Sequence, residues 1–118
     1  MDNPNDQLSV EWVTEAIIRQ QYNDSQLFEK WKSGEIVGVT KRSSHPDTPP
    51  VGEPICTHSQ IVYYYSRENK PLAIVHQYLR PDGTIGASGF PDPKRLFLKD
   101  KILFVRSARP KDNTTPTE

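Results

Sequence analysis

Two apolar runs near the middle of the chain constrain its fold most. Residues 60–65 and 72–79 are rich in β-branched and aromatic side chains, and a polar segment, residues 67–70, lies between them. This pattern is typical of a β-hairpin, and we expect its turn at Glu68 and Asn69. The turn would place three pairs of residues opposite each other: Ile61 and His76, Tyr63 and Ile74, and Tyr65 and Leu72. Apolar residues then lie on both faces, as in central strands that a second layer covers on at least one side.

Two short amphipathic helices are expected before this hairpin. Ser9 suits the N-cap of the first helix, because its hydroxyl can accept a hydrogen bond from an amide of the opening turn. Apolar residues then recur at helical spacing as far as Ile17. Asp24 or Ser25 could cap the second helix, and Gly34 suits the left-handed residue that ends it.

Three further segments have the composition of strands. Residues 36–40 form a short β-branched run, and residues 96–98 and 102–105 flank a polar turn as a second hairpin would. The chain is therefore predicted to be α+β. We expect two short N-terminal helices packed on one face of a mostly antiparallel sheet of four or five strands.

Proline and glycine mark the loops. Residues 41–54 contain four prolines and are predicted to form a long exposed loop, because proline fixes φ and removes hydrogen-bond donors. Glycines and prolines also gather at residues 81–93, which indicates a loop of defined shape. We expect a single domain over residues 9–106, with a flexible N-terminus at residues 1–8 and a disordered polar tail at residues 107–118.

The charges balance, but they are unevenly distributed. The chain has 15 basic and 15 acidic side chains. Residues 1–55 carry 9 acidic and 5 basic side chains, whereas residues 56–118 carry 6 acidic and 10 basic ones. This asymmetry points weakly to an anionic partner at the C-terminal half. The near-neutral isoelectric point, about 6.8, argues against a dedicated high-affinity DNA-binding protein.

Several classes of protein and of site are not expected. No apolar run is long enough to span a membrane, and the first residues do not resemble a secretory signal, so we expect a soluble cytoplasmic protein without membrane contact. Cys56 is alone and cannot form an internal disulfide. Cys56 and His58 are two residues apart, but the expected register places His76 about 10 Å further along the sheet. We therefore predict neither a metal site nor a cofactor.

One face of the expected hairpin carries chemically active side chains. His76, Tyr78 and Arg80 alternate along a strand and should point the same way, and Tyr63 and Tyr65 of the neighbouring strand share that face. These groups could form a metal-free phosphoryl-transfer site. His76 or Tyr78 would move protons, and Arg80 would stabilise the charged phosphorus centre. The simpler interpretation is that the imidazole and the phenols are half-buried packing residues.

A second group of candidates follows the hairpin. Residues 86–89 are small and could present backbone amides to an anion, and Lys94 and Arg95 come shortly afterwards. We predict that Ser88, Lys94 and Arg95 bind an anion or a partner together with the two tyrosines, Tyr63 and Tyr65. The simpler interpretation is an exposed bend that Phe90 holds against the core.

Two functions remain open from the sequence. The first is a small accessory protein that binds a protein or RNA partner through the loops at residues 41–54 and 81–95. The second is a metal-independent ribonuclease that uses His76, Tyr78 and Arg80. The order of two helices followed by an antiparallel sheet is similar to that of small ribonuclease toxins of the RelE-like type. This resemblance lies in element order alone, so it implies RNA as a substrate but assigns no catalytic position.

Overall fold

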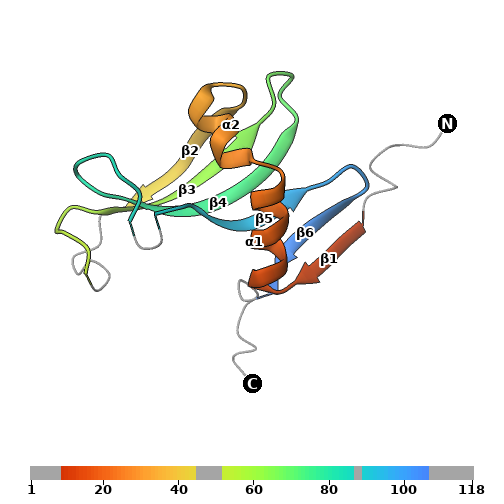
Figure 1. Cartoon of the computed structure of the whole chain (residues 1–118), viewed down its shortest axis with the longest axis horizontal. Helices are drawn as coiled ribbons and strands as arrows, with labels where there is room; N and C mark the ends of the chain where they lie inside the picture. The colour runs from red at the N-terminus through yellow and green to blue at the C-terminus, as the bar shows by residue number, and fades with distance from the viewer. Residues whose placement is uncertain (1–8, 45–51, 87–88, 107–118) are drawn as a thin grey trace.

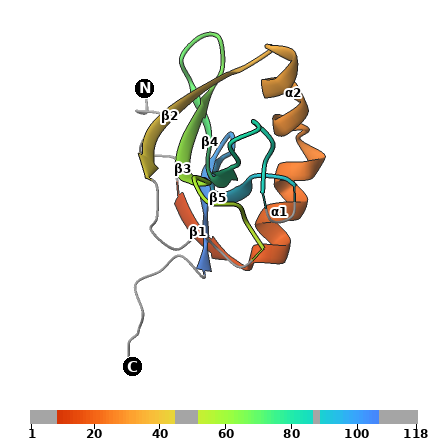
Figure 2. The same ribbon diagram turned by 90° about the vertical axis from the view of Figure 1, so that its left-hand side faces the viewer.

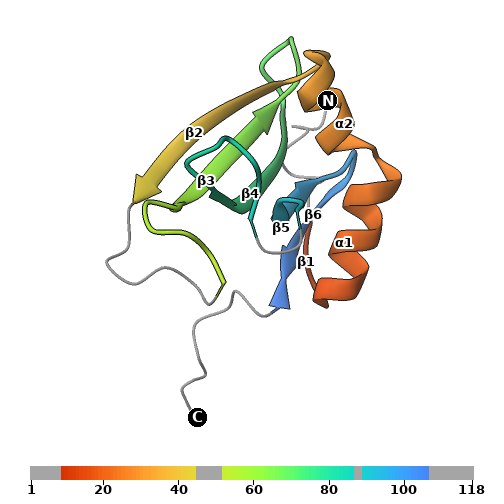
Figure 3. The same ribbon diagram turned by 60° about the vertical axis from the view of Figure 1, so that its left-hand side comes forward.

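Six strands form one mixed sheet, and both helices lie on the same face of it (Figures 1 and 3). The computed structural model describes residues 9–44, 52–86 and 89–106. Its elements in chain order are β1 (Ser9–Val13), α1 (Glu15–Asp24), α2 (Leu27–Ser33), β2 (Val37–Ser44), β3 (His58–Tyr65), β4 (Pro71–Leu79), β5 (Asp92–Phe97) and β6 (Lys101–Val105). The strand order is β1-β6-β5-β4-β3-β2. The predicted α+β class is confirmed.

The first element is a strand, so the helix expected from Ser9 was wrong. β1 pairs in parallel with β6, with Val10 beside Ile102 and Val13 beside Val105. The first helix begins at Glu15, because the Thr14 hydroxyl accepts a hydrogen bond from the Ile17 amide at 3.2 Å and caps it. Pairing with a strand from the far end of the sequence outweighs the helical spacing, which explains six strands rather than four or five.

The second helix ends as predicted but begins differently. Gly34 follows α2 with a φ of 86°, the left-handed conformation expected there. Its N-cap is Gln26, with a φ of 56°, rather than Asp24 or Ser25. The Ser25 hydroxyl instead donates to the Gln21 carbonyl at the end of α1. The two helices are therefore separated by a single tight bend.

The central hairpin has the predicted register except beside its turn. Ile61 lies opposite His76 and Tyr63 opposite Ile74, but Tyr65 lies opposite Pro71 rather than Leu72. The turn spans three residues instead of two, because the Ser66 amide donates to the Lys70 carbonyl and Asn69 is left-handed, with a φ of 68°. A type I turn followed by a left-handed residue adds one residue to a hairpin and shifts the last pair.

The core lies between the helices and the sheet. It joins apolar residues of both layers, among them Ile18, Val62, Val75 and Leu96. At its centre the hydroxyls of Tyr22 and Tyr64 are 2.9 Å apart and form a buried hydrogen bond. Burial raises the pKa of Tyr22 to about 12 and raises the pKa of Tyr64 further, so both phenols stay protonated at neutral pH.

Trp31 of α2 completes this core. Its ring lies 5.1 Å from the ring of Tyr64 and packs over Gly38 of β2. A Cβ atom at residue 38 would lie 2.5 Å from the Trp31 Nε1 atom, so the close approach of α2 to the sheet requires glycine there. The helix-covered side is thus built around aromatic side chains.

Parts of the expected domain organisation lie outside the described residues. These are the termini predicted to be flexible, residues 1–8 and 107–118, and residues 45–51 of the predicted proline-rich loop. That loop starts later than expected, since β2 continues through Ser44. Within the described part of the chain, neither helix is long and apolar enough to cross a membrane.

Candidate functional site

The face of the sheet opposite the helices, here called the open face, has no helix over it (Figure 2). Strand alternation places aromatic rings on this face from three strands of the sheet, β1, β6 and β3. Trp12 of β1 and Phe104 of β6 pack with ring centroids 5.0 Å apart, and Tyr63 and Tyr65 of β3 lie 6.4 Å apart. Because these rings are half-buried rather than covered, the open face presents aromatic surface to solvent.

A bulge in β2 places two cations on this face. Thr40 pairs with Val62 and Arg42 pairs with Ile61, so Lys41 is an extra residue between them. A bulge of this kind brings consecutive side chains to the same side of a strand. The Lys41 ammonium lies 5.5 Å from the centre of the Tyr63 ring, and Arg42 is in register with Ile61 of the same face.

A second bulge, in β5, does the same with another basic pair. Val75 pairs with Pro93 and Ile74 pairs with Arg95, which leaves Lys94 as the extra residue. Lys94 and Arg95 border the same hollow of about 290 Å³, which Trp12, Tyr63 and Phe104 also line. The Arg95 guanidinium lies 4.3 Å from the centre of the Phe104 ring, within cation–π distance.

His76 lies at the edge of this aromatic and basic surface. Its Nε2 atom is 2.8 Å from the Ser59 hydroxyl, and its ring meets that of Tyr78 edge to face at 4.7 Å. Burial lowers the pKa of His76, the charge of Lys94 lowers it further, and Asp92 opposes them. The imidazole is therefore mainly neutral at pH 7.

This environment predicts a pH dependence of stability. Because the pKa of His76 is lower in the folded chain than its ordinary value of 6.5, the unfolded chain takes up the proton first as the pH falls. The free energy of unfolding of the wild type should therefore fall more steeply below pH 6.5 than that of His76→Gln. Urea unfolding at a series of pH values measures both slopes, with His58→Gln as the control. Equal slopes for wild type and His76→Gln would contradict the placement of His76.

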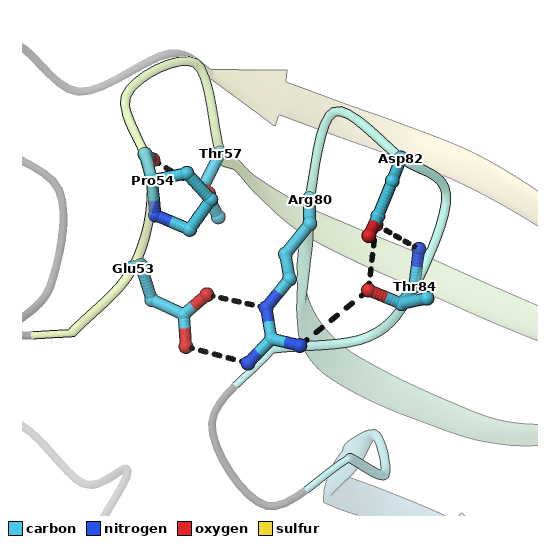
Figure 4. Close-up of polar contacts among 6 residues, drawn as sticks. All are labelled: Glu53, Pro54, Thr57, Arg80, Asp82 and Thr84. Atoms are coloured by element: carbon cyan, nitrogen blue, oxygen red, sulfur yellow. Dashed lines mark hydrogen bonds and ion pairs between the residues drawn. The ribbon is translucent and has the colours of Figure 1, made fainter.

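Arg80 is bound to another part of the chain. Its Nε and Nη2 atoms donate to the two carboxylate oxygens of Glu53, at 2.8 and 3.3 Å (Figure 4). The Glu53 side chain is 5% exposed, so this ion pair fastens the segment before β3 to the turn after β4. The charged groups that act on His76 are Lys94 and Asp92 rather than Arg80. The structure thus brings His76 and Tyr78 together and directs Arg80 to Glu53.

Two hydrogen-bonded turns frame this ion pair (Figure 4). The Thr57 hydroxyl donates to the Pro54 carbonyl at 2.8 Å, and Thr57 is fully buried. The Asp82 carboxylate accepts from the amide and the hydroxyl of Thr84, which lowers the pKa of Asp82. Arg80 is therefore part of a hydrogen-bonded junction between two loops.

The predicted anion site in residues 86–89 is only partly described. Ser88 lies outside the described residues. Gly86 lies against Glu53, since a Cβ atom there would be 2.6 Å from a carboxylate oxygen. The negative charge of the Glu53 carboxylate disfavours binding of an anion to the backbone at Gly86. Lys94 and Arg95 belong to the open face instead.

Four residues of the open face were missing from the sequence prediction: Trp12, Lys41, Arg42 and Phe104. Ile102 and Phe104 are two residues apart in a predicted strand, so the sequence could have indicated that they share one face of the sheet. The basic pairs were visible as sequence, but their placement depends on bulges. Within the described ranges, no cluster of three histidine, cysteine or acidic residues is placed to hold a metal ion.

Comparison with known proteins supplies no relative, because no protein-family model, curated protein or solved structure matches the chain. The element order also differs from the one that suggested RelE-like toxins, since a strand precedes the helices.

Proposed function

We propose that this chain binds single-stranded nucleic acid on the open face of its sheet. One observation carries the proposal: half-buried aromatic rings and two basic pairs share this face, and two separate bulges place those pairs there. Unpaired bases stack on aromatic side chains, and lysine and arginine neutralise the backbone phosphates. The proposal moves the binding surface from the proline- and glycine-rich loops to the sheet.

The charge distribution favours a nucleic acid over an apolar protein partner. The helices on the other side carry acidic and basic side chains in equal number. On the open face Lys94 forms an ion pair with Asp92, which also forms one with Arg19 of α1. A surface with excess positive charge between rings suits a polyanion whose bases are free to stack.

Fluorescence anisotropy with labelled oligonucleotides tests the proposal. A single strand of about 12 nucleotides is long enough for a site of this kind. If four cations contact phosphates, the logarithm of the association constant should fall with the logarithm of salt concentration with a slope of about −3. A duplex of the same sequence should bind at least tenfold more weakly, because its bases are already stacked. Tighter binding of the duplex, or no binding of either, would contradict the proposal.

The ribonuclease function, with His76, Tyr78 and Arg80 as its catalytic residues, stays a prediction. Arg80 is engaged with Glu53, so the structure adds no observation in its favour. Incubation of the protein with a labelled RNA oligonucleotide in EDTA, followed by a denaturing gel, would show cleavage directly.

A further inference from the structure

We infer that one base of the bound strand sits in the hollow of the open face between Tyr63 and Arg95, and that the nucleic acid runs across the β-strands there. The inference rests on the proposed function, and the direction follows from the strand registers. Residues in register across β1, β6, β5, β4 and β3 form one continuous row: Trp12, Phe104, Arg95, Ile74 and Tyr63. All five line the hollow of about 290 Å³. The hollow is therefore a depression that crosses the sheet.

The hollow has room for one base. Its walls, Tyr63 of β3 and Arg95 of β5, belong to strands two spacings apart, which is roughly 10 Å. A planar ring that contacts a side chain on each side needs about 7–8 Å, because atoms in contact are about 3.5–4 Å apart. The volume of about 290 Å³ is also just below the roughly 300 Å³ at which pockets for drug-sized ligands begin. We therefore assign one base to it rather than a stacked pair.

The walls of the hollow suit stacking, and its floor is aliphatic. The Arg95 guanidinium lies 4.3 Å from the centre of the Phe104 ring, so a cation and a ring form one wall together, opposite Tyr63. Bases stack both on aromatic rings and on arginine planes. Ile61 and Ile74 line the hollow between these walls, and their side chains offer no hydrogen bond.

Cations on both sides of the hollow suit the backbone of a strand rather than a neutral apolar ligand. Lys94 and Arg95 border it on one side. On the other side the Lys41 ammonium, from β2, lies 5.5 Å from the centre of the Tyr63 ring. Lys94 pairs with Asp92 at 3.0 Å, but both side chains are about one-third exposed, and a phosphate can compete for an ion pair at the surface. The phosphates before and after the seated base therefore each meet a cation.

An aliphatic floor predicts selection by ring area rather than by hydrogen bonding. A purine covers more of both walls than a pyrimidine does. Adenine and guanine should therefore bind alike, and both should bind more tightly than cytosine or uracil. Purine itself, which lacks the amino group of adenine, should bind as adenine does.

A spacer strand with a single base isolates this contact. A chain of about eight abasic sugar phosphates, within the usual site sizes, is compared with the same chain carrying one adenine in the middle. The two ligands have the same backbone charge and differ by one base. By fluorescence anisotropy the wild type should bind the adenine strand about tenfold more tightly, as expected for the stacking of one base. Purine should give the same gain, and uracil a smaller one.

Tyr63 and Tyr65 provide a matched pair of variants. Both rings are half-buried on the open face of β3, 6.4 Å apart, and of the two Tyr63 lines the hollow. Tyr63→Ala should abolish the gain from the single base, whereas Tyr63→Phe and Tyr65→Ala should retain it. A gain that survives in Tyr63→Ala, or that both alanine variants lose equally, would overturn the inference.

Methyl NMR of the wild type gives a readout that needs no variant. The ring current of a seated base should shift the methyl resonances of Ile61 and Ile74, which line the hollow, and leave those of Ile18 in the core unchanged. Unshifted Ile61 and Ile74 resonances at a saturating concentration of the adenine strand would also overturn the inference.

The same measurements distinguish the two possible failures. Binding of ordinary oligonucleotides, with no gain from the single base in the spacer strand, would overturn the base site and leave the proposed function standing. A shift of the Ile61 and Ile74 methyl resonances by adenosine monophosphate, with no binding of any oligonucleotide, would support the hollow as a nucleotide site and overturn the proposed function.

Discussion

Replacing all four residues of the two basic pairs by glutamine should lower the affinity for single-stranded nucleic acid by about 10²–10³-fold at roughly 0.1 M salt. The variant carries Lys41→Gln, Arg42→Gln, Lys94→Gln and Arg95→Gln. Each cation that contacts a phosphate releases condensed counterions, and four such contacts contribute nearly three powers of ten to the association constant at this salt concentration. The salt dependence of binding should disappear with them. Anisotropy titrations over a series of salt concentrations measure both effects.

A second quadruple variant controls for net charge. Lys30, Lys32, Lys70 and Lys99 lie on α2 and in the two hairpin turns, away from the open face. Their replacement by glutamine removes the same charge and should leave the affinity within a fewfold of the wild type. If both quadruple variants lose affinity equally, binding depends on net charge alone, and the open face is not the site.

The largest loss of stability is expected from Tyr64→Ala. Tyr64 is 0% exposed and meets both helices, through the Tyr22 hydroxyl and the Trp31 ring. Truncation of a buried aromatic side chain costs about 3–5 kcal/mol, mostly through the cavity that it leaves. A domain of this size is stable by only about 5–15 kcal/mol, so the variant should be close to unfolding at room temperature. Urea titration followed by circular dichroism measures the change.

Phenylalanine substitutions isolate the hydrogen bond from the packing. Tyr64→Phe leaves the Tyr22 hydroxyl buried without its partner, which costs about 1–3 kcal/mol. The double variant Tyr22→Phe and Tyr64→Phe should cost less than the two single changes together, because no unpaired hydroxyl remains. Strict additivity would show that the two hydroxyls do not interact.

The sequence was most informative where local alternation determines the structure. The β3–β4 hairpin and the face shared by Tyr63, Tyr65, His76 and Tyr78 follow from a period of two residues and a turn of nearly known length. Gly34 likewise follows from the backbone conformation that ends a helix. These predictions needed no knowledge of distant contacts.

Long-range pairing explains what the sequence did not reveal. Val10 and Val13 have helical spacing, and only their position beside β6 makes them part of a strand. Arg80 continues the alternation of β4, yet a carboxylate from a proline-rich segment binds its guanidinium. Lys41 and Lys94 are ordinary basic residues until a one-residue irregularity turns them to the open face. Lys94 and Arg95 were predicted as binding residues, whereas Lys41 and Arg42 were not, and the face that each pair occupies depends on a bulge that local pattern does not show.

The parallel pairing of β1 with β6 has a consequence for biosynthesis. A ribosome delivers Ser9 long before Lys101, the residue it finally adjoins, so β1 must wait for nearly all of the described chain to emerge. Until then β1 has no partner in the nascent chain, and an unpaired strand is a template for misassembly with other chains. Contacts between such distant segments also slow folding. Completion of the sheet is thus a late event in biosynthesis, in which β6 captures a strand that was made long before it.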